Sequence, residues 1–211
     1  TKSFFIENTN KDTLLTNTLS NPNFDNTLYV EGHFESEKYF FTYKKDLKAS
    51  LIINENLIDK NNQFINSIKD SNSISIHIRR HRFSEEKSKN YITNALKSDE
   101  FTESIIKYVY RGVDFFKKIV ENPKFFIWSN DFSNLDNHFN NKDFTFVKNN
   151  DLATDFYLFS LSKHFIVGPS TFHWWGAWLN NNPNKICLRP DDNLLNPSDN
   201  KNFWPKNWLK F

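Results

Sequence analysis

Between residues 72 and 190 the sequence alternates short apolar runs with longer segments of helical spacing, which limits the folds open to the chain. The run 73-SISIHI-78 alternates polar residues with β-branched apolar residues, a pattern typical of a strand. Strands that alternate with helices favour a parallel sheet with right-handed crossovers. We therefore predict an α/β fold, a Rossmann-like parallel sheet with helices on both faces. The further predicted strands are 124–129, 144–147, 165–168 and 185–189.

Three segments between these runs have the apolar spacing of helices. The segment 98–122 opens with Ser98 and two acidic residues, as at a helix N-terminus, and it stops before Pro123. The segments 151–164 and 171–181 predict two shorter helices that lead into and out of the strand between them.

The composition bounds the class of protein. A chain of 211 residues can bury a sizeable core. A net charge of +2 without a basic run argues against nucleic-acid binding. Cys187 is the single cysteine, which excludes a disulfide framework and favours a reducing compartment. Neither a signal peptide nor an apolar run near the ~20 residues of a membrane span is present, so we expect a cytoplasmic protein.

The N-terminal part of the sequence has a different character. Its first thirty residues are polar and rich in Asn, and the chain contains no Met. We expect a partial chain, in which residues 1–70 form an incomplete N-terminal region and residues 71–211 form a complete domain. Within the first region a helix is expected to begin near Ser36.

Unusual polar residues gather where the predicted strands end. His77, Arg79 and Arg80 close the first strand, residues 129–131 follow the second, and residues 168–171 follow the fourth. In an open parallel sheet, ligands bind beyond the carboxyl ends of the strands. The sequence therefore predicts a binding site at this edge.

The arginines are concentrated at one of these strand ends. The chain has 22 lysines and five arginines, and three of the five are Arg79, Arg80 and Arg82. A planar guanidinium can contact an oxyanion through two parallel hydrogen bonds, which an ammonium cannot do. The cluster favours a phosphate site, with a solvated basic turn as the alternative.

The stretch 168-GPST-171 combines a strand end with a predicted helix start. Ser170 and Thr171 could cap the helix, and free backbone N–H groups at the positive end of its dipole suit a phosphate. Ordinary capping without a ligand is the alternative. The predicted helix carries three tryptophans, Trp174, Trp175 and Trp178. Because indoles bury well, we expect at least two of the three to lie in the core.

The remaining polar candidates have plain structural alternatives. Ser129, Asn130 and Asp131 could contact a ligand from a strand tip, or form a turn or helix cap. Asp155 could be an exposed surface acid or a nucleobase contact. The sequence has no G-x-G-x-x-G, Walker A or D-x-D motif. The prediction is a metal-free diphosphate site neutralised by arginines and a helix N-terminus.

Taken together, these motifs resemble those of the bacterial α-1,2-fucosyltransferases of glycosyltransferase family 11. That family carries an H-x-R-R-x-D block, a later S-D/N-D strand tip and an N-S-T-F-S-W-W-G-A-W-L block. The similarity covers roughly residues 29–211. The corresponding segments here are 77-HIRRHR-82, 129-SND-131 and 169-PSTFHWWGAWL-179, together with 32-GHFESEKYF-40 and 203-FWPKNWLKF-211.

The resemblance implies a GT-B-like enzyme, a galactoside α-1,2-fucosyltransferase-like glycosyltransferase. It would transfer L-fucose from GDP-β-L-fucose to a sugar hydroxyl, often galactose O2, with inversion and without a metal or other cofactor. Residues 71–211 would be the donor-binding domain with a C-terminal tail, and residues 1–70 a partial acceptor-side region. The acceptor would be an oligosaccharide or glycolipid, and peripheral association with the inner membrane is expected.

The same resemblance implies roles for individual residues. Arg79 would hold the β-phosphate, and Ser170 and Thr171 would support the diphosphate. Asp155 would face the guanine. Positive charge around the departing β-phosphate would stabilise the transition state, so Arg79 is also a predicted catalytic residue. The other predicted donor-binding residues are His77, Arg80, Ser129, Asn130, Asp131 and Phe172.

The chain departs from the family pattern at several positions. Arg82 stands in place of the family's Asp, His81 in place of Gly, and Pro169 in place of Asn. Because the carboxylate at position 82 is lost, Glu85 is predicted to be catalytic in its place, although Glu85 and Glu86 could simply form a solvated acidic turn. The family's N-terminal G-G-x-G-N-Q loop is absent.

Two other functions therefore stay open. One is a nucleotide-sugar-binding domain without catalysis, which the lost carboxylate and the missing N-terminal loop would favour. The other is a transferase that uses a different GDP-sugar.

Overall fold

The computed structural model describes residues 3–7, 27–51, 58–60, 62–84, 91–194 and 202–211. The chain divides into two compact units, residues 1–52 with 195–207 and residues 53–194 with 208–211. The predicted division at residue 70, with its donor and acceptor roles, stays a prediction.

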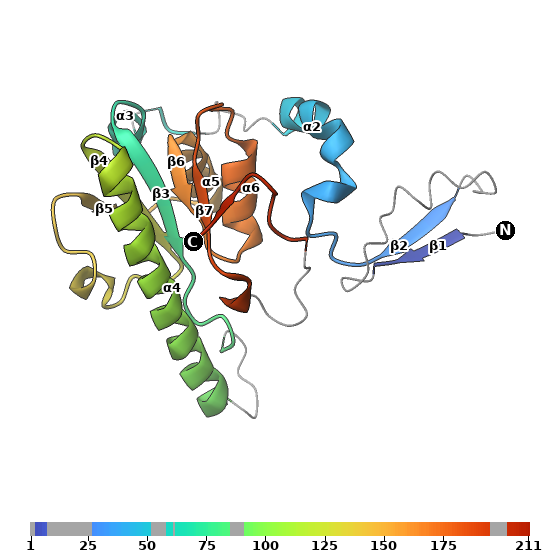
Figure 1. The fold of residues 1–211 in the computed structure, drawn as a ribbon, viewed down its shortest axis with the longest axis horizontal. Helices are drawn as coiled ribbons and strands as arrows, with labels where there is room; N and C mark the ends of the chain where they lie inside the picture. The colour runs from blue at the N-terminus through green and yellow to red at the C-terminus, as the bar shows by residue number, and fades with distance from the viewer. Residues whose placement is uncertain (1–2, 8–26, 52–57, 61, 85–90, 195–201) are drawn as a thin grey trace. The chain divides into compact units, whose positions relative to one another are not determined.

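The larger unit is built on a parallel sheet of six strands in the order β5-β4-β3-β6-β7-β8 (Figure 1). The five predicted strands are confirmed, and the sixth, β8, was not predicted because two residues carry no periodicity. The strands are β3 (Asn72–Ile78), β4 (Pro123–Ser129), β5 (Phe144–Phe146), β6 (His164–Ile166), β7 (Cys187–Arg189) and β8 (Leu209–Lys210).

When the six strands are renumbered from 1, beginning with β3, their order in the sheet is 3-2-1-4-5-6, which is the order of the Rossmann fold. The chain first winds outward from β3 through β4 to β5, and then returns to β6 on the other side of β3. The winding direction therefore reverses between β3 and β6. In folds of this kind, ligands bind at the carboxyl ends of the strands beside such a reversal.

Helices cover both faces of the sheet, as predicted (Figure 1). Ile74, Ile76 and Ile78 of β3 pack into one core with apolar residues of α4. Ser75 points to the opposite face, where its hydroxyl donates to the Phe159 carbonyl at 2.9 Å. The helices are α3 (Gln63–Lys69), α4 (Tyr91–Ile119), α5 (Leu152–Leu161) and α6 (Thr171–Leu179), with short 3₁₀ turns η4 (Leu135–Asn137) and η5 (Asp192–Leu194).

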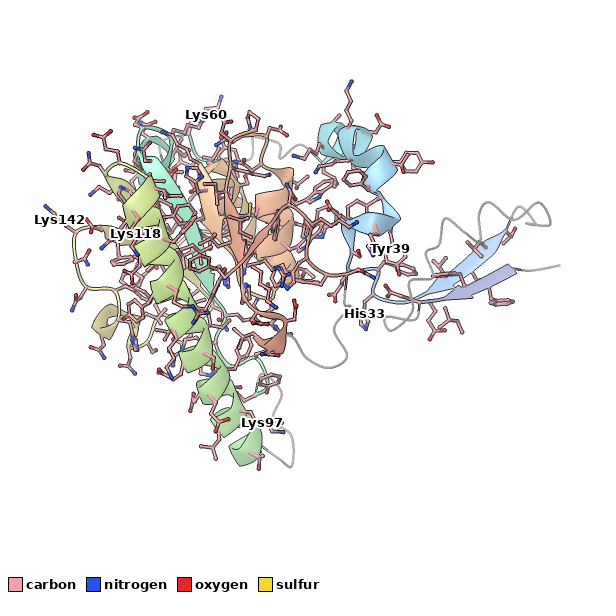
Figure 2. All side chains as sticks on the ribbon, viewed as in Figure 1. His33, Tyr39, Lys60, Lys97, Lys118 and Lys142 are labelled. Atoms are coloured by element: carbon pink, nitrogen blue, oxygen red, sulfur yellow. The ribbon has the colours of Figure 1, made fainter. Side chains whose placement is uncertain are left out.

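Helix α4 begins earlier than its sequence signal indicated, and the prediction of an N-terminus at Ser98 is wrong. Ser98 is fully buried inside the helix, and its hydroxyl accepts a hydrogen bond from the Phe83 backbone N–H at 3.0 Å. Ser98 and the two acidic residues that follow it resemble a capping sequence, but the Ser98 hydroxyl contacts the loop after β3 instead. Lys97 and Lys118 in Figure 2 lie towards the two ends of this long helix.

The tryptophans of α6 behave as predicted. Trp174 and Trp178 are buried and stack with ring centroids 5.8 Å apart, whereas Trp175 is partly exposed. Trp208, next to β8, adds a third ring to this cluster at 5.8 Å from Trp174. The indoles thus attach α6 to the C-terminal edge of the larger unit.

The smaller unit contains a pair of parallel strands, and one carboxylate joins the segments that follow them. Glu7 follows β1 and accepts hydrogen bonds from the backbone N–H groups of His33 and Phe34 and from the Tyr39 hydroxyl. The predicted helix start near Ser36 is confirmed as an N-cap, although the first turns are 3₁₀. The elements are β1 (Ser3–Ile6), β2 (Leu28–Glu31), η1 (Glu37–Tyr39), η2 (Phe41–Tyr43) and α2 (Lys44–Ser50).

No helix in the part of the chain that the structure describes is both long enough and apolar enough to cross a membrane.

Gly176 tests how tightly α6 packs on α5. A Cβ at this position would lie 2.6 Å from Cδ1 of Phe159, so Gly176→Ala forces the ring to move. We expect this variant to lose about 1–3 kcal/mol of unfolding free energy to overpacking, partly offset by the ~1 kcal/mol that Ala gains in a helix. Urea denaturation followed by far-UV circular dichroism measures the difference.

Gly112→Ala in α4 is the matched control. Its Cβ would first meet flexible side-chain ends, Cδ1 of Ile166 at 2.9 Å and Cδ1 of Leu188 at 3.2 Å. We expect this variant to be close to neutral. Equal losses for the two variants would contradict the close α5–α6 contact.

Candidate functional site

The structure brings the ends of β3 and β6 together at the reversal of strand order. The Gly168 backbone lies so close to β3 that a Cβ there would come within 3.3 Å of the His77 carbonyl oxygen. One side chain of the β3–α4 loop, Arg82, donates a hydrogen bond to the Pro169 carbonyl. The arginine-rich strand end and the entrance of α6 therefore form one edge, although they are about ninety residues apart in sequence.

Arg80 is engaged by the strand tip after β4. Its guanidinium donates to Asp131 at 3.1 Å and to the Ser133 carbonyl at 2.6 Å. Its backbone exchanges two hydrogen bonds with the Asn130 side chain, at 2.8 and 3.0 Å. The Ser129 hydroxyl donates to the Ile78 carbonyl at 2.7 Å. Residues 129–131 thus hold the loop after β3, and their predicted contact with a ligand stays a prediction.

Asp131 is the acceptor at the centre of this network. Its carboxylate also lies 2.8 Å from Nε2 of His81 and accepts from the Ser133 hydroxyl and backbone N–H. Hydrogen bonds from Ser133 and His81, with the nearby charge of Arg80, hold the pKa of Asp131 well below its usual range. The carboxylate stays ionised at neutral pH and orients Arg80.

His81 adopts a left-handed backbone conformation, with a φ of 59°. This region favours glycine because a Cβ is strained there. The family pattern has Gly at this position, so the structure explains the pattern and the cost of departing from it. The contact between the His81 ring and Asp131 offsets part of that cost.

A pair of histidines lies between β3 and α6. The rings of His77 and His173 are 3.0 Å apart between centroids, and His173 is fully buried. Nδ1 of His77 and both ring nitrogens of His173 are buried without a hydrogen-bond partner. Buried polar groups are normally satisfied, so this pair of rings is unusual for a protein core.

Both imidazoles are held neutral. Burial, followed by the charge of Arg79, lowers the pKa of His77 to about 3. Burial also lowers the pKa of His173 well below its ordinary value, and the charges of His77 and Arg79 lower it further. An interaction with the Gly168 backbone raises this pKa, but by less than burial lowers it. Arg79 is therefore close enough for its charge to act on both rings.

The entrance of α6 carries three of the predicted residues. Ser170 is the N-cap in an extended conformation, but its side chain makes no capping hydrogen bond. Thr171 is exposed in the first turn. The Phe172 ring lies 5.9 Å from His77 and packs edge-on against Phe156 at 5.2 Å. The capping alternative for the Ser170 hydroxyl is not realised.

Asp155 lies on the first turn of α5 and is half-buried, not the exposed acid of the default interpretation. Asn150 donates to it at 3.0 Å and accepts in turn from Asn62, the N-cap of α3, at 2.8 Å. Burial raises the pKa of Asp155, and the hydrogen bond from Asn150 acts against that rise. The carboxylate is thus built into a polar link between α3 and α5.

Glu85, the predicted catalytic carboxylate, lies outside the described residues, as does Glu86. The sequence interpretation missed His173 and Asn150. His173 stands where the family block has Ser, and that departure was the available signal. Asn150 lies in an Asn-rich chain in which no single Asn attracts notice.

Comparisons with known proteins agree on one family. The model of glycosyl transferase family 11 matches residues 7–210. An alpha-1,2-colitosyltransferase of Escherichia coli is 30% identical over 167 residues, which are 75% of this chain and 53% of that protein. The O-antigen biosynthesis glycosyltransferase WbnK of Escherichia coli is 30% identical over 126 residues, 58% of this chain and 39% of that protein.

The chain thus spans about half or less of the length of these curated relatives. No solved structure matches it significantly.

The neutral histidine pair predicts an acid-sensitive fold. A lowered folded-state pKa means that the unfolded chain binds protons that the folded chain does not, so stability should fall as pH drops below about 6.5. Each such histidine contributes a slope of up to about 1.4 kcal/mol per pH unit. His173→Ser should remove the part of this pH dependence of the unfolding free energy that His173 contributes. Urea denaturation at several pH values between about 7.5 and 5 measures it.

The wild type and His173→Ser differ at one titratable group, so the difference between their slopes isolates that group. Parallel stability curves for the two proteins would show that His173 is not held neutral.

Proposed function

The chain belongs to glycosyl transferase family 11, and we propose that it transfers L-fucose from GDP-β-L-fucose to a sugar hydroxyl, with galactose O2 as the first candidate. The proposal includes inversion at the transferred carbon and a GT-B-like arrangement in which the larger unit binds the donor. The observation that carries it is the close approach of the end of β3, which Arg79 follows, to the entrance of α6 beside the β3–β6 reversal.

Leaving-group chemistry supports this interpretation of the edge. When the sugar departs, negative charge develops on the β-phosphate of GDP, and positive groups fixed in advance around that oxygen lower the barrier. In the proposal, Arg79 supplies a planar cation and the first turn of α6 supplies backbone N–H groups at the positive end of its dipole. Ser170, whose hydroxyl makes no cap, and exposed Thr171 would complete the diphosphate contacts.

The remaining predicted donor contacts take supporting positions in this scheme. Asp131, Asn130 and Ser129 would keep Arg80 and its loop in place without touching the donor, because their hydrogen bonds are made within the edge. Asp155 would accept a hydrogen bond from the guanine in addition to the one from Asn150. Phe172 and His77 would line the path between the base and the diphosphate.

Metal independence is part of the proposal. Two or more cationic groups and a helix N-terminus can neutralise a diphosphate, which is the task of Mg²⁺ or Mn²⁺ in enzymes that bind a metal–diphosphate complex. The general base for the acceptor hydroxyl is proposed to be Glu85.

A second candidate function is favoured by one relative. The E. coli alpha-1,2-colitosyltransferase is similar over three quarters of this chain, so a colitose donor competes with fucose. A third candidate, a nucleotide-sugar-binding domain without catalysis, is favoured by Arg82 in place of the family's acid. The proposed acceptor is an oligosaccharide or glycolipid, with the enzyme in the cytoplasm or peripheral at the inner membrane.

Arg79 is the residue on which donor binding should depend most. We expect Arg79→Ala to weaken GDP binding about 100-fold, because the proposed charge-assisted contact with the diphosphate is lost. Isothermal titration calorimetry measures the affinity. Added EDTA should leave the affinity of the wild type unchanged.

Lys118→Ala is the charge-matched control for Arg79→Ala. Lys118 is exposed on the last turn of α4, which leads to the start of β4 and not to the carboxyl ends of the strands (Figure 2). The Lys118→Ala variant should bind GDP with the affinity of the wild type. Retained affinity in Arg79→Ala, or equal losses in both variants, would refute the assignment of the phosphate site.

The donor is decided by competition. Release of GDP with a galactose-terminated acceptor should be fastest from GDP-fucose, against GDP-linked colitose and GDP-mannose at equal concentration. Preference for the colitose donor would support the second candidate. Tight GDP binding with no transfer across an acceptor panel would support the third.

A further inference from the structure

Arg82 occupies the position at which the family pattern has an acid, and its surroundings give it a different task. We propose that Arg82 is a positioning residue for the donor diphosphate, which holds the entrance of α6 beside the Arg79 end of β3. The inference rests on the proposed function for its consequence, but its geometry stands on the contacts of the chain itself.

The Arg82 side chain connects three elements of the larger unit. It leaves the loop after β3, its Cζ lies 5.2 Å from the centroid of the Phe101 ring on α4, and it donates a hydrogen bond to the carbonyl of Pro169 ahead of α6. Pro169 is buried and Arg82 is partly buried, so water competes weakly for this bond. The guanidinium is thus a rigid bridge between α4 and the α6 entrance.

The loop that carries Arg82 is itself anchored. The Ser84 backbone N–H donates to the His81 carbonyl at 3.0 Å, which closes a turn around Arg82. Next to it, the Phe83 backbone N–H donates to the Ser98 hydroxyl at 3.0 Å, and the Phe83 ring packs edge-on against Phe101 at 5.7 Å. Arg82 therefore reaches Pro169 from a base that is fixed on α4.

The carbonyl of Pro169 is a sensitive point for the site. Proline fixes φ, so holding its carbonyl orients the next residues, Ser170 and Thr171, whose backbone begins the helix. The first intrahelical bond comes at once, from the Trp174 N–H to the Ser170 carbonyl at 3.1 Å. A shift of the Pro169 carbonyl would move the N–H groups that the proposed function assigns to the diphosphate.

The two departures from the family pattern are therefore a matched pair. An ionised aspartate at position 82 would have no hydrogen to donate to the Pro169 carbonyl. An arginine donates to that carbonyl and also lies over the Phe101 ring, an arrangement that suits a guanidinium better than an ammonium. Asp131 meanwhile orients Arg80, so the loop does not lack a carboxylate partner.

Hydrogen exchange of the protein without nucleotide tests the positioning role directly. In Arg82→Ala we expect the Trp174 amide to exchange about 10-fold faster, because one hydrogen bond from a charged donor at the helix entrance is lost. Amides in the middle of β3 and β4 should keep wild-type protection, which shows that the fold is intact. Arg82→Lys, which can still donate to Pro169, should give an intermediate rate.

Nucleotide binding provides the second readout. GDP affinity of Arg82→Ala should fall about 10-fold, and millimolar guanidinium should restore part of it by filling the place of the lost group. Lys148→Ala is the control, since Lys148 is a cation that lies 4.7 Å from the ring centroid of Phe132, an aromatic residue in the loop after β4. This control should change neither Trp174 exchange nor GDP affinity.

Each other outcome overturns the inference. Lost affinity with unchanged Trp174 exchange would mean that Arg82 contacts the phosphate itself, and unchanged values of both would mean that the bridge has no effect. A wild type that fails to bind GDP would refute the proposed function alone, because the exchange experiment needs no nucleotide.

Discussion

The parallel pairing of β3 with β6 is the constraint on which the rest of the site depends. It brings Ile74 to Ile76 into register with His164 to Ile166, so the two strands end at the same edge. The residues that come after the two strands must then share a small space. The His77 carbonyl and the Gly168 backbone approach so closely that a side chain at Gly168 would be crowded. The histidine pair and the Arg82 bridge are consequences of that approach.

Three neighbouring arginines have different tasks because each meets a different partner. Arg80 lies against Asp131 and is neutralised by it. Arg82 meets a carbonyl and an aromatic ring, which orient its guanidinium without removing its charge. Arg79 acts on two neutral imidazoles and disfavours their protonation. A carboxylate, a carbonyl and two imidazoles are thus the neighbours that distinguish the three arginines.

The departures from the family motifs are structurally linked rather than scattered. His81 accepts a left-handed backbone and contacts Asp131. Arg82 and Pro169 contact each other, and His173 packs on His77. Each replaced residue thus meets a partner within the same edge.

The local pattern of the sequence was sufficient for strands β3 to β7 and for helices α4, α5 and α6, because these segments carry apolar runs or apolar residues at helical spacing, whereas α3 was not predicted. It was also sufficient to place the polar strand ends at one edge, since the carboxyl ends of parallel strands coincide. It failed at the start of α4, where Ser98 has the character of a cap but is buried, and at β8, which is too short to show a period. Propensity describes neighbours in sequence, and these features are decided by distant partners.

The sequence by itself determined that the chain is an α/β protein with arginines and a helix start at the ends of two strands. Only the tertiary structure decided which of those groups engage one another: Arg80 with Asp131, Arg82 with Pro169, His77 with His173. The reason is physical, because hydrogen bonds and burial depend on distances between residues that are about fifty to about a hundred positions apart in the chain, and no local pattern encodes such distances.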